Sequence, residues 1–185
     1  MLDFTHLIET TQSSSQVYQG SFLKVMHDKV LLPNGHIAVR EYIRHPRAAA
    51  VLALTTDNKI ILEYQYRYPT KQTLLEIPAG KIDNPETPLE CAKRELLEET
   101  GYIAKNWVLL GECLPCIAYS DEKISYFLAT DLHLTQSNLD AGELLQVTTM
   151  DVEEFINLAY LGKIQDSKTL SGIMLYLGYA RKINK

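Results

Sequence analysis

Long apolar runs, a secretion signal and paired cysteines are all missing from this sequence. No stretch approaches the roughly 18 consecutive apolar residues that a membrane-spanning helix needs. The opening residues MLDFTHLIETTQSSS lack the basic start and the apolar run of a signal peptide, so we expect a cytoplasmic protein with no membrane partner. The three cysteines are too few, and odd in number, for a framework of disulfide bonds.

Two of the cysteines form the motif Cys113-Leu-Pro-Cys116, which elsewhere is redox-active or supplies half of a zinc site. A structural zinc site would need two further ligands, and the sequence has no second CxxC and no close pair of histidines. A thioredoxin-like motif opens a helix after a strand, whereas residues 117–120 are typical of a loop. We therefore interpret the pair as ordinary thiols.

An excess of positive charge is missing as well. The formal net charge is −5 and the pI is about 5.5, so nothing indicates a nucleic-acid partner, and we expect a small-molecule substrate. With 185 residues and 46% hydrophobic content, the chain can bury a sizeable core. We predict an N-terminal β extension over residues 1–43 and a main domain over residues 44–185.

Alternation of apolar and polar residues predicts mostly strands. The dipeptide Asn34-Gly35 between two alternating runs is a strong hairpin signal, and a turn at Asp57-Asn58 predicts a second hairpin. The polar segment 10–15 is expected to be a mobile join. The predicted strands cover residues 16–28, 36–44, 49–55, 60–66, 74–77, 108–113, 123–129 and 145–149.

Two helices are predicted near the C-terminus. One follows Asp151, a candidate N-cap, and the other runs from about Ser167 to Ala180. We expect their apolar faces to pack in the core; that of the second helix comprises Leu170, Ile173, Met174 and Leu177. The order of strands and helices suits a mixed sheet between helices.

The most informative segment reads GKIDNPETPLECAKRELLEETGY and begins at Gly80. Thr87 and Glu90 have the spacing of a capping box, and Pro88 suits the first helical position because its missing N–H costs nothing there. Gly101 supplies the left-handed residue that ends a helix. The segment therefore predicts a helix between Thr87 and Gly101.

Three carboxylates gather on one arc near the end of this helix. Glu95 is a like-charge neighbour of Glu98 and Glu99, at a cost of roughly 0.2–0.5 kcal/mol for each pair. The negative end of the helix dipole adds roughly 0.3–1 kcal/mol. Arg94 can offset Glu98 in part, and no other basic residue of the segment lies on that arc. Composition alone favours a solvated acidic face, whereas the local electrostatics favour a bound divalent cation.

The spacing of the fixed residues decides between these interpretations. Five residues separate Gly80 from Glu86, and seven separate Glu86 from Arg94. The matching positions are Gly80, Glu86, Arg94, Glu95, Leu96, Glu98, Glu99, Gly101 and Tyr102. Because every fixed position of the Nudix box is matched, the chain resembles the Nudix hydrolases, which cleave a diphosphate linkage attached to a nucleoside. The resemblance implies an α/β (α+β) fold, an α/β/α sandwich around a mixed β-sheet.

The resemblance also implies a metal site. It makes Glu95 and Glu99 the primary ligands of Mg²⁺, or alternatively Mn²⁺. Glu98 is the next candidate ligand, and the carbonyl of Ala79 is an additional one. Mg²⁺ suits the reaction because it prefers hard oxygen ligands and keeps waters, one of which can be oriented or deprotonated. The positions that the resemblance makes structural are Gly80, Glu86, Arg94 and Gly101.

Residues before the box indicate the substrate class. The segment Gln65-Tyr66-Arg67 and the later Leu75–Gly80 are similar to the ADP-ribose and nucleotide-sugar pyrophosphatase branch. In that branch the arginine reaches a substrate phosphate, so Arg67 is the first candidate, and Arg44 and Arg47 are weaker ones. Two positions depart from the pattern of that branch. The proline that usually follows the box comes early, at Pro115. Tyr119 lies near the position at which dinucleoside-polyphosphate hydrolases have a tyrosine. The choice of diphosphate therefore stays open.

The reaction also needs a general base, which these enzymes often supply from a flexible loop. The resemblance places Glu143 at the expected loop position and leaves open whether it is the base, a metal ligand or neither. Glu122 is the alternative, and Glu98 of the box is also a catalytic candidate.

The sequence also leaves room for two rival functions. One rival is a module that binds a nucleotide sugar without cleaving it, although such modules often lose carboxylates that this chain retains. The other is a metal-dependent redox protein built on CxxC, which the surrounding pattern supports poorly. In the ADP-ribose branch comparable N-terminal strands pack across a dimer, so the resemblance implies a homodimer.

Overall fold

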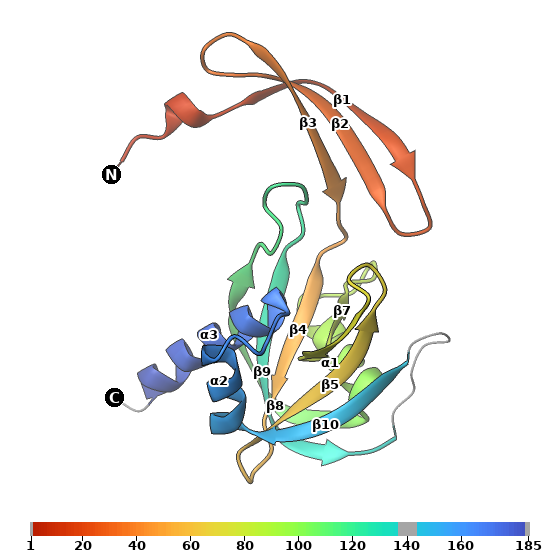
Figure 1. Ribbon diagram of the computed structural model, residues 1–185, viewed down its shortest axis with the longest axis vertical. Helices are drawn as coiled ribbons and strands as arrows, with labels where there is room; N and C mark the ends of the chain where they lie inside the picture. Colours follow the sequence, from red (N-terminus) through yellow and green to blue (C-terminus); the bar gives the residue numbers. More distant parts are fainter. Residues whose placement is uncertain (1, 137–143, 184–185) are drawn as a thin grey trace. The chain divides into compact units, whose positions relative to one another are not determined.

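The computed structural model describes residues 2–136 and 144–183, which form two compact units (Figure 1). The N-terminal unit comprises the residues up to Pro46 together with the loop Cys116–Glu122. The second unit comprises Arg47–Pro115 and the chain from Lys123 onward. No helix in the described ranges is long and apolar enough to cross a membrane.

A three-stranded antiparallel sheet forms the N-terminal unit. A short 3-10 helix, η1 (Thr5–Leu7), precedes its strands, which lie in the order β1 (Thr10–Gln19), β2 (Lys24–Leu31) and β3 (Ile37–Arg44). The predicted turn between β2 and β3 is confirmed, and Gly35 adopts a φ of 85° that glycine tolerates without strain. The loop Cys116–Glu122 joins this unit because the amide of Ile43 donates to the Tyr119 carbonyl at 2.8 Å.

Two predictions for this unit were wrong. Residues 10–15 are not a mobile join but part of β1, because they pair with β2. Their side chains are all polar and exposed, so the sequence lacks the alternation of apolar and polar residues that would have predicted a strand. Residues 16–28 are not one strand, since the chain turns back at Gly20, whose amide donates to the Leu23 carbonyl at 2.8 Å.

In the described part of the second unit, the chain forms two sheets and three helices. One sheet has the order β7-β4-β9-β8 and the other has the order β10-β5-β6. β4 pairs parallel with β9 and antiparallel with β7, so the predicted mixed sheet is confirmed. The strands are β4 (Ala48–Ala53), β5 (Lys59–Arg67), β6 (Gln72–Glu76), β7 (Ala79–Lys81), β8 (Tyr102–Cys113), β9 (Ile124–Leu134) and β10 (Leu145–Asp151), and the helices are α1 (Pro88–Thr100), α2 (Val152–Tyr160) and α3 (Ser167–Ile183).

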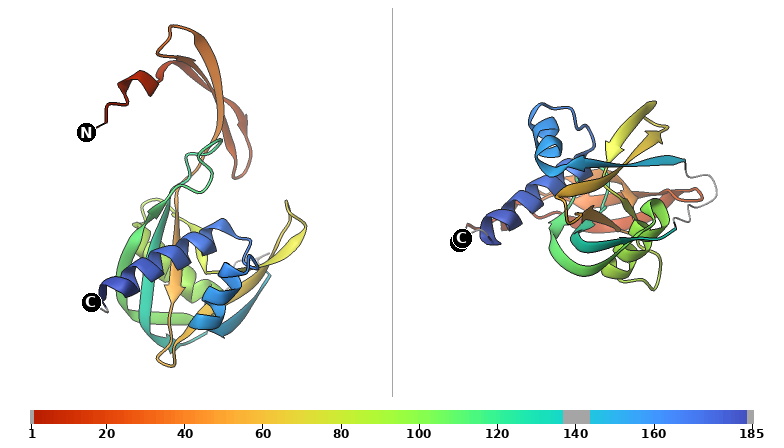
Figure 2. Two further views of the ribbon diagram at one scale, coloured as in Figure 1. Left: turned by 60° about the vertical axis from the view of Figure 1, so that its left-hand side comes forward. Right: turned by 90° about the horizontal axis from the view of Figure 1, so that it is seen from below.

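β4 lies at the centre of the sandwich. All six of its residues are buried, as expected for an apolar strand that is covered on both faces. Ala48, Ala50 and Leu52 pack in a cluster with residues of α2 and α3. The alternate residues Ala49, Val51 and Ala53 pack in a second cluster with α1, which lies on the opposite side of the strands (Figure 2). The predicted helix–sheet–helix layers are therefore confirmed.

The box helix begins and ends as predicted. In α1 the Thr87 hydroxyl accepts from the Glu90 amide at 3.3 Å, and the Glu90 carboxylate accepts from the Thr87 amide at 2.7 Å. Gly101 ends the helix with a φ of 76°, and its amide donates to the Leu97 carbonyl. The Asp151 cap of α2 is confirmed too, because its side chain accepts from the Glu153 amide.

Three other details differ from the predictions. β4 and β5 do not form a hairpin, because they belong to different sheets; an isolated bridge joins Leu54, which follows β4, to Ile60 of β5. β8 and β9 are longer than predicted, since their antiparallel pairing extends beyond the apolar segments. Met174 does not face the core, and 65% of it is exposed.

Candidate functional site

At the acidic end of α1, the Glu95 carboxylate lies against Gly80 of β7. Pairing with β4 places Gly80 opposite Ala49. A Cβ atom at Gly80 would lie 1.8 Å from Oε1 of Glu95 and 2.0 Å from its Cδ. A side chain at this position would have to displace the Glu95 carboxylate, so it is the absence of a Cβ atom at Gly80 that lets the carboxylate lie against the strand.

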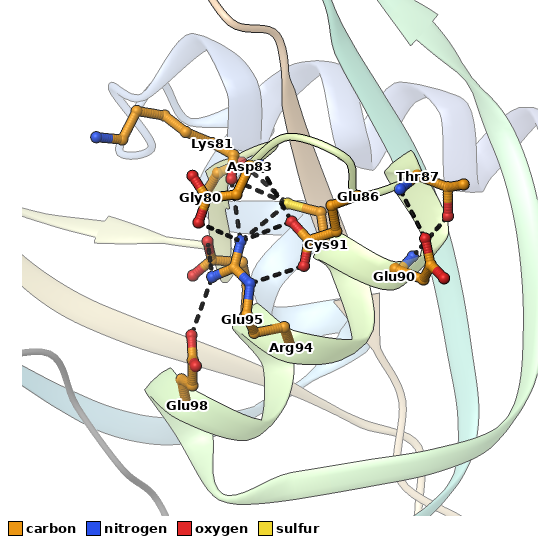
Figure 3. Close-up of polar contacts among 10 residues, drawn as sticks. All are labelled: Gly80, Lys81, Asp83, Glu86, Thr87, Glu90, Cys91, Arg94, Glu95 and Glu98. Carbon is orange, nitrogen blue, oxygen red and sulfur yellow. Dashed lines mark hydrogen bonds and ion pairs between the residues drawn. The ribbon is translucent and has the colours of Figure 1, made fainter. Parts of the chain in front are cut away.

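Arg94 organises the carboxylates around it (Figure 3). Its Nε and NH2 groups donate to the two oxygens of Glu86 at 2.8 and 3.0 Å, and its NH1 group donates to Glu95 at 2.7 Å and to Glu98 at 3.0 Å. NH2 also donates to the Lys81 carbonyl at 3.0 Å, which fixes the loop before the helix. The hydrogen bonds to Glu86 hold the pKa of Arg94 above its ordinary value, and they lower the pKa of Glu86.

Glu99 holds the other predicted ligand position. Its Oε2 accepts from the amide of Ala79 at 3.0 Å, and the residue is 4% exposed. One residue earlier, the Pro78 carbonyl accepts from the Val51 amide at 2.9 Å. The backbone of Ala79, whose carbonyl is the predicted additional ligand, is therefore fixed between the central strand and the box helix.

Carboxylates outnumber the guanidinium that pairs with them at this end of α1. Arg94 forms ion pairs with Glu86, Glu95 and Glu98, while the Glu99 carboxylate accepts from the Ala79 amide, and Glu95 and Glu99 are both buried. Buried carboxylates need compensation by opposite charge, and hard oxygen ligands are those that Mg²⁺ and similar cations prefer. The residues thus fit a divalent cation in charge and in ligand type.

Among the described residues, however, no three acidic, His or Cys side chains converge on one point where they could hold a metal ion. Arg94 bridges Glu95 and Glu98, and Glu99 is turned to the Ala79 amide. A cation at this site would have to share Glu95 and Glu98 with Arg94. Cys91 lies beneath this network, and burial raises its pKa to about 12, so it is a neutral thiol at pH 7.

A second charged cluster, which the sequence analysis missed, surrounds the predicted phosphate-binding residue. Arg67 donates from Nε and NH2 to the two oxygens of Glu76 at 2.8 and 2.6 Å. Lys168 at the start of α3 also contacts Glu76, and it donates to Asp166 at 2.9 Å. A charged residue within the apolar segment Leu74-Leu75-Glu76-Ile77 was the signal available in the sequence for Glu76.

The remaining candidates lie elsewhere. Arg47 donates to Glu112 at 3.0 Å in the second unit. Arg44 and Glu122 belong to the N-terminal unit, where Arg44 donates to the Tyr42 hydroxyl at 3.0 Å and Glu122 lies 3.8 Å from Nε2 of His45. Glu143 lies outside the described residues. All three cysteines are free thiols.

The chain is similar to known proteins over most of its length. The NUDIX domain family matches residues 44–171, and the family described as nucleoside diphosphate sugar hydrolase N-terminal domain matches residues 9–43. An ADP-ribose pyrophosphatase of Bacillus subtilis (strain 168) is 37% identical over 169 residues, which cover 90% of this chain and 91% of that protein. A methanol dehydrogenase activator of Bacillus methanolicus is 36% identical over 167 residues, with coverage of 89% and 90%.

The fold is similar to that of a solved structure. A crystal structure of an ADP compounds hydrolase superposes with a TM-score of 0.82 and covers 94% of this chain and 95% of its own. At 23% sequence identity, this likeness concerns the fold alone.

Substitution of Gly80 tests whether the packed Glu95 carboxylate belongs to a cation site. In Gly80→Ala the new methyl group must displace that carboxylate, and we expect affinity for Mn²⁺ to fall by about 10- to 100-fold. Titration of Mn²⁺ followed by electron paramagnetic resonance measures this without any substrate. The matched control is Gly178→Ala, where a Cβ meets nothing within 4 Å, and its affinity should not change. Equal Mn²⁺ affinity in both folded variants would contradict the assignment.

Removal of Arg94 tests its electrostatic role. The pKa of Glu86 is lowered mainly by its hydrogen bond from Arg94, so this pair stabilises the fold above the unfolded carboxyl pKa and stops doing so as the pH falls through the folded pKa. Arg94→Met should therefore be less stable than the wild type at pH 7, and the difference should shrink below about pH 4.

Urea unfolding midpoints in EDTA from pH 3.5 to pH 8 measure this difference. Lys93→Met, an exposed neighbour on the same helix, is the control for loss of one positive charge. A difference for Arg94→Met that stays constant with pH would show that packing, rather than charge pairing, is what Arg94 contributes.

Proposed function

Because this chain belongs to the NUDIX family of hydrolases, we propose that it cleaves the diphosphate of ADP-ribose or a related nucleoside diphosphate sugar. The products would be a nucleoside monophosphate and a sugar phosphate. The observation that carries the proposal is the complete box, in which Gly80 admits the Glu95 carboxylate and the acidic charge exceeds what Arg94 can balance. Similarity to an ADP-ribose pyrophosphatase over 90% of the chain supports the substrate class.

Divalent cations are the general cofactors of this family, and for this chain we propose Mg²⁺, with Mn²⁺ as the alternative. Glu95 and Glu99 would hold the cation, together with Glu98 and the carbonyl of Ala79. When bound, a divalent cation neutralises charge on the diphosphate and supplies an oriented water. The ion pairs of Arg94 with Glu86, Glu95 and Glu98 would keep these ligands in place.

The chemistry assigned to the other residues follows from the reaction. Water attacks one phosphorus while the bridging P–O bond breaks, the sugar phosphate or nucleotide leaves, and the proton of the water passes to a general base. We propose Glu143 as that base, with Glu122 and Glu98 as alternatives. Arg67 would bind a phosphate because the NH1 side of its guanidinium points away from Glu76, while Arg44 is a weaker candidate for the same role.

Other substrates and a role without catalysis are the alternatives. GDP-mannose or a dinucleoside polyphosphate would use the same box, and a purely binding module would not need its carboxylates. The relative in Bacillus methanolicus bears the name of an activator, so a regulatory role deserves a direct test. The retained glutamates favour hydrolysis.

We propose further that residues 1–43 form an extension to a hydrolase domain over residues 44–185, in a cytoplasmic homodimer. The separate family matches to residues 9–43 and 44–171 support the division at residue 43.

Multi-angle light scattering after size-exclusion chromatography tests the assembly. Two copies of a 21.0 kDa chain should give a particle of about twice that mass, and the mass should persist on dilution if the contact is specific. A mass of one chain at micromolar concentration would contradict the dimer.

Product analysis tests the activity. Purified protein with Mg²⁺ should convert ADP-ribose to AMP and ribose 5-phosphate, and ADP-ribose should be preferred over GDP-mannose, UDP-glucose and diadenosine polyphosphates. Glu99→Gln should lower kcat by at least about 100-fold, since it removes a charge that acts on the transition state. Glu90→Gln is the matched control on the same helix, because glutamine also completes a capping box and activity should not change. Binding of ADP-ribose without turnover by the wild type would exclude the hydrolase assignment in favour of the sensor.

A further inference from the structure

A group of four charged side chains lies where α3 begins, outside the box. Glu76 is the last residue of β6, and Arg67 is the last residue of β5. Asp166 precedes α3, and Lys168 lies in its first turn. These residues alternate in sign along a chain of contacts from Arg67 to Glu76, Lys168 and Asp166.

One buried carboxylate is shared by two cations in this group. The Glu76 side chain is 2% exposed and contacts both the guanidinium of Arg67 and the ammonium of Lys168. Burial raises the pKa of Glu76, but the hydrogen bonds from Arg67 and the charge of Lys168 outweigh that effect and hold the pKa below its ordinary value. Glu76 is therefore ionised at neutral pH, and both cations act on the same charge.

Lys168 is fixed on its other side by Asp166. The Asp166 carboxylate accepts from Lys168 Nζ at 2.9 Å, and it also accepts from the amide and the hydroxyl of Thr169 at 3.0 and 2.6 Å. These bonds cap the start of α3. The Lys168 side chain is only 12% exposed, so its ammonium is held between two carboxylates and does not move freely in solvent.

Arg67 presents a different part of its guanidinium to solvent. Its Nε and NH2 edge is bound to Glu76, whereas 40% of the side chain is exposed. Among the described residues, its NH1 group forms no hydrogen bond. A guanidinium carries five N–H donors in a fixed plane, so the edge bound to Glu76 sets the direction of the others.

The balance of charge depends on Lys168. With it, the four side chains sum to zero; without it, they sum to −1. Glu63, the cross-strand partner of Glu76, also acts on the charge of Arg67 and makes the surroundings more acidic. Without the charge of Lys168, a diphosphate approaching Arg67 would meet surroundings that are more negative by one unit charge.

We propose that Lys168 is a positioning residue for the hydrolysis described above: by sharing Glu76, it keeps the exposed side of Arg67 electropositive and directed toward the substrate diphosphate. The inference rests on the proposed function, since it needs a substrate phosphate at Arg67. It assigns to the start of α3, which is remote from the box in sequence, a part in substrate binding rather than in the chemical step.

A structural role alone must be separated from this one. The same region also joins the helix to the sheet, because the Thr169 hydroxyl accepts from the Ile77 amide at 3.0 Å. Loss of that connection would lower stability and all activities together. Loss of the Lys168 charge, by contrast, should weaken substrate binding selectively.

The test compares Lys168→Met, Lys168→Arg and the control Lys163→Met, which removes an exposed lysine just before α3. We expect Lys168→Met to raise KM for ADP-ribose about tenfold while kcat stays within about twofold. Calorimetric titration with α,β-methylene-ADP-ribose should show a similar loss of affinity. Lys168→Arg should restore both values toward those of the wild type, and Lys163→Met should leave them unchanged.

A second variant, which changes the charge of the cluster in the opposite direction, tests the proposal if Lys168→Met does not fold. Asp166→Asn retains an acceptor for the helix cap but removes one negative charge, so KM should fall below the wild-type value. Unchanged KM in Lys168→Met, equal losses in the Met and Arg variants, or a higher KM in Asp166→Asn would each overturn the proposal. If the wild type turns over none of the diphosphates, the proposed function itself fails; turnover with an unchanged KM in Lys168→Met overturns only the role of Lys168.

Discussion

A surplus of buried negative charge at the end of α1 is the constraint around which the second unit is arranged. Burial of carboxylates is costly unless opposite charge or donors surround them, and here both kinds of partner are used. Arg94 contacts three of the carboxylates, and the backbone amide of Ala79 contacts the fourth, Glu99. The loop before the helix, strand β7 and the helix itself are held together through these contacts.

The central strand explains why the acidic end can be held so firmly. β4 is covered on both faces, and it fixes β7 by pairing and the preceding proline by a hydrogen bond to the Val51 amide. Glu95 approaches Gly80 on this support, so the carboxylate lies against backbone that is held by its pairing with β4. Functional groups placed on well-packed strands and helices are positioned more accurately than groups placed on loops.

The sequence predicted correctly those parts of the fold that are determined by residues close to one another in the chain. The capping box, the left-handed glycine and the glutamates of α1 lie within a few residues of one another, so their geometry follows from helix periodicity alone. β1 was missed because a polar strand is defined by its partner β2, and β5 was assigned to a hairpin because a turn signal does not specify which strand will pair. The contact of Glu76 with Lys168 joins residues 92 positions apart, and no spacing rule connects them.

The loop Cys116–Glu122 has a consequence for how this protein can be dissected. Its backbone pairs with Ile43: the Tyr119 carbonyl accepts from the Ile43 amide, and the Asp121 amide donates to the Ile43 carbonyl. The Asp121 carboxylate also accepts from the His45 amide at 2.6 Å. The sequence boundary at residue 43 is therefore not a boundary of the folded units, because a segment from the middle of the hydrolase domain completes the N-terminal one. Exchanging that N-terminal part with that of a relative would therefore require exchange of both segments if these backbone contacts are to be kept.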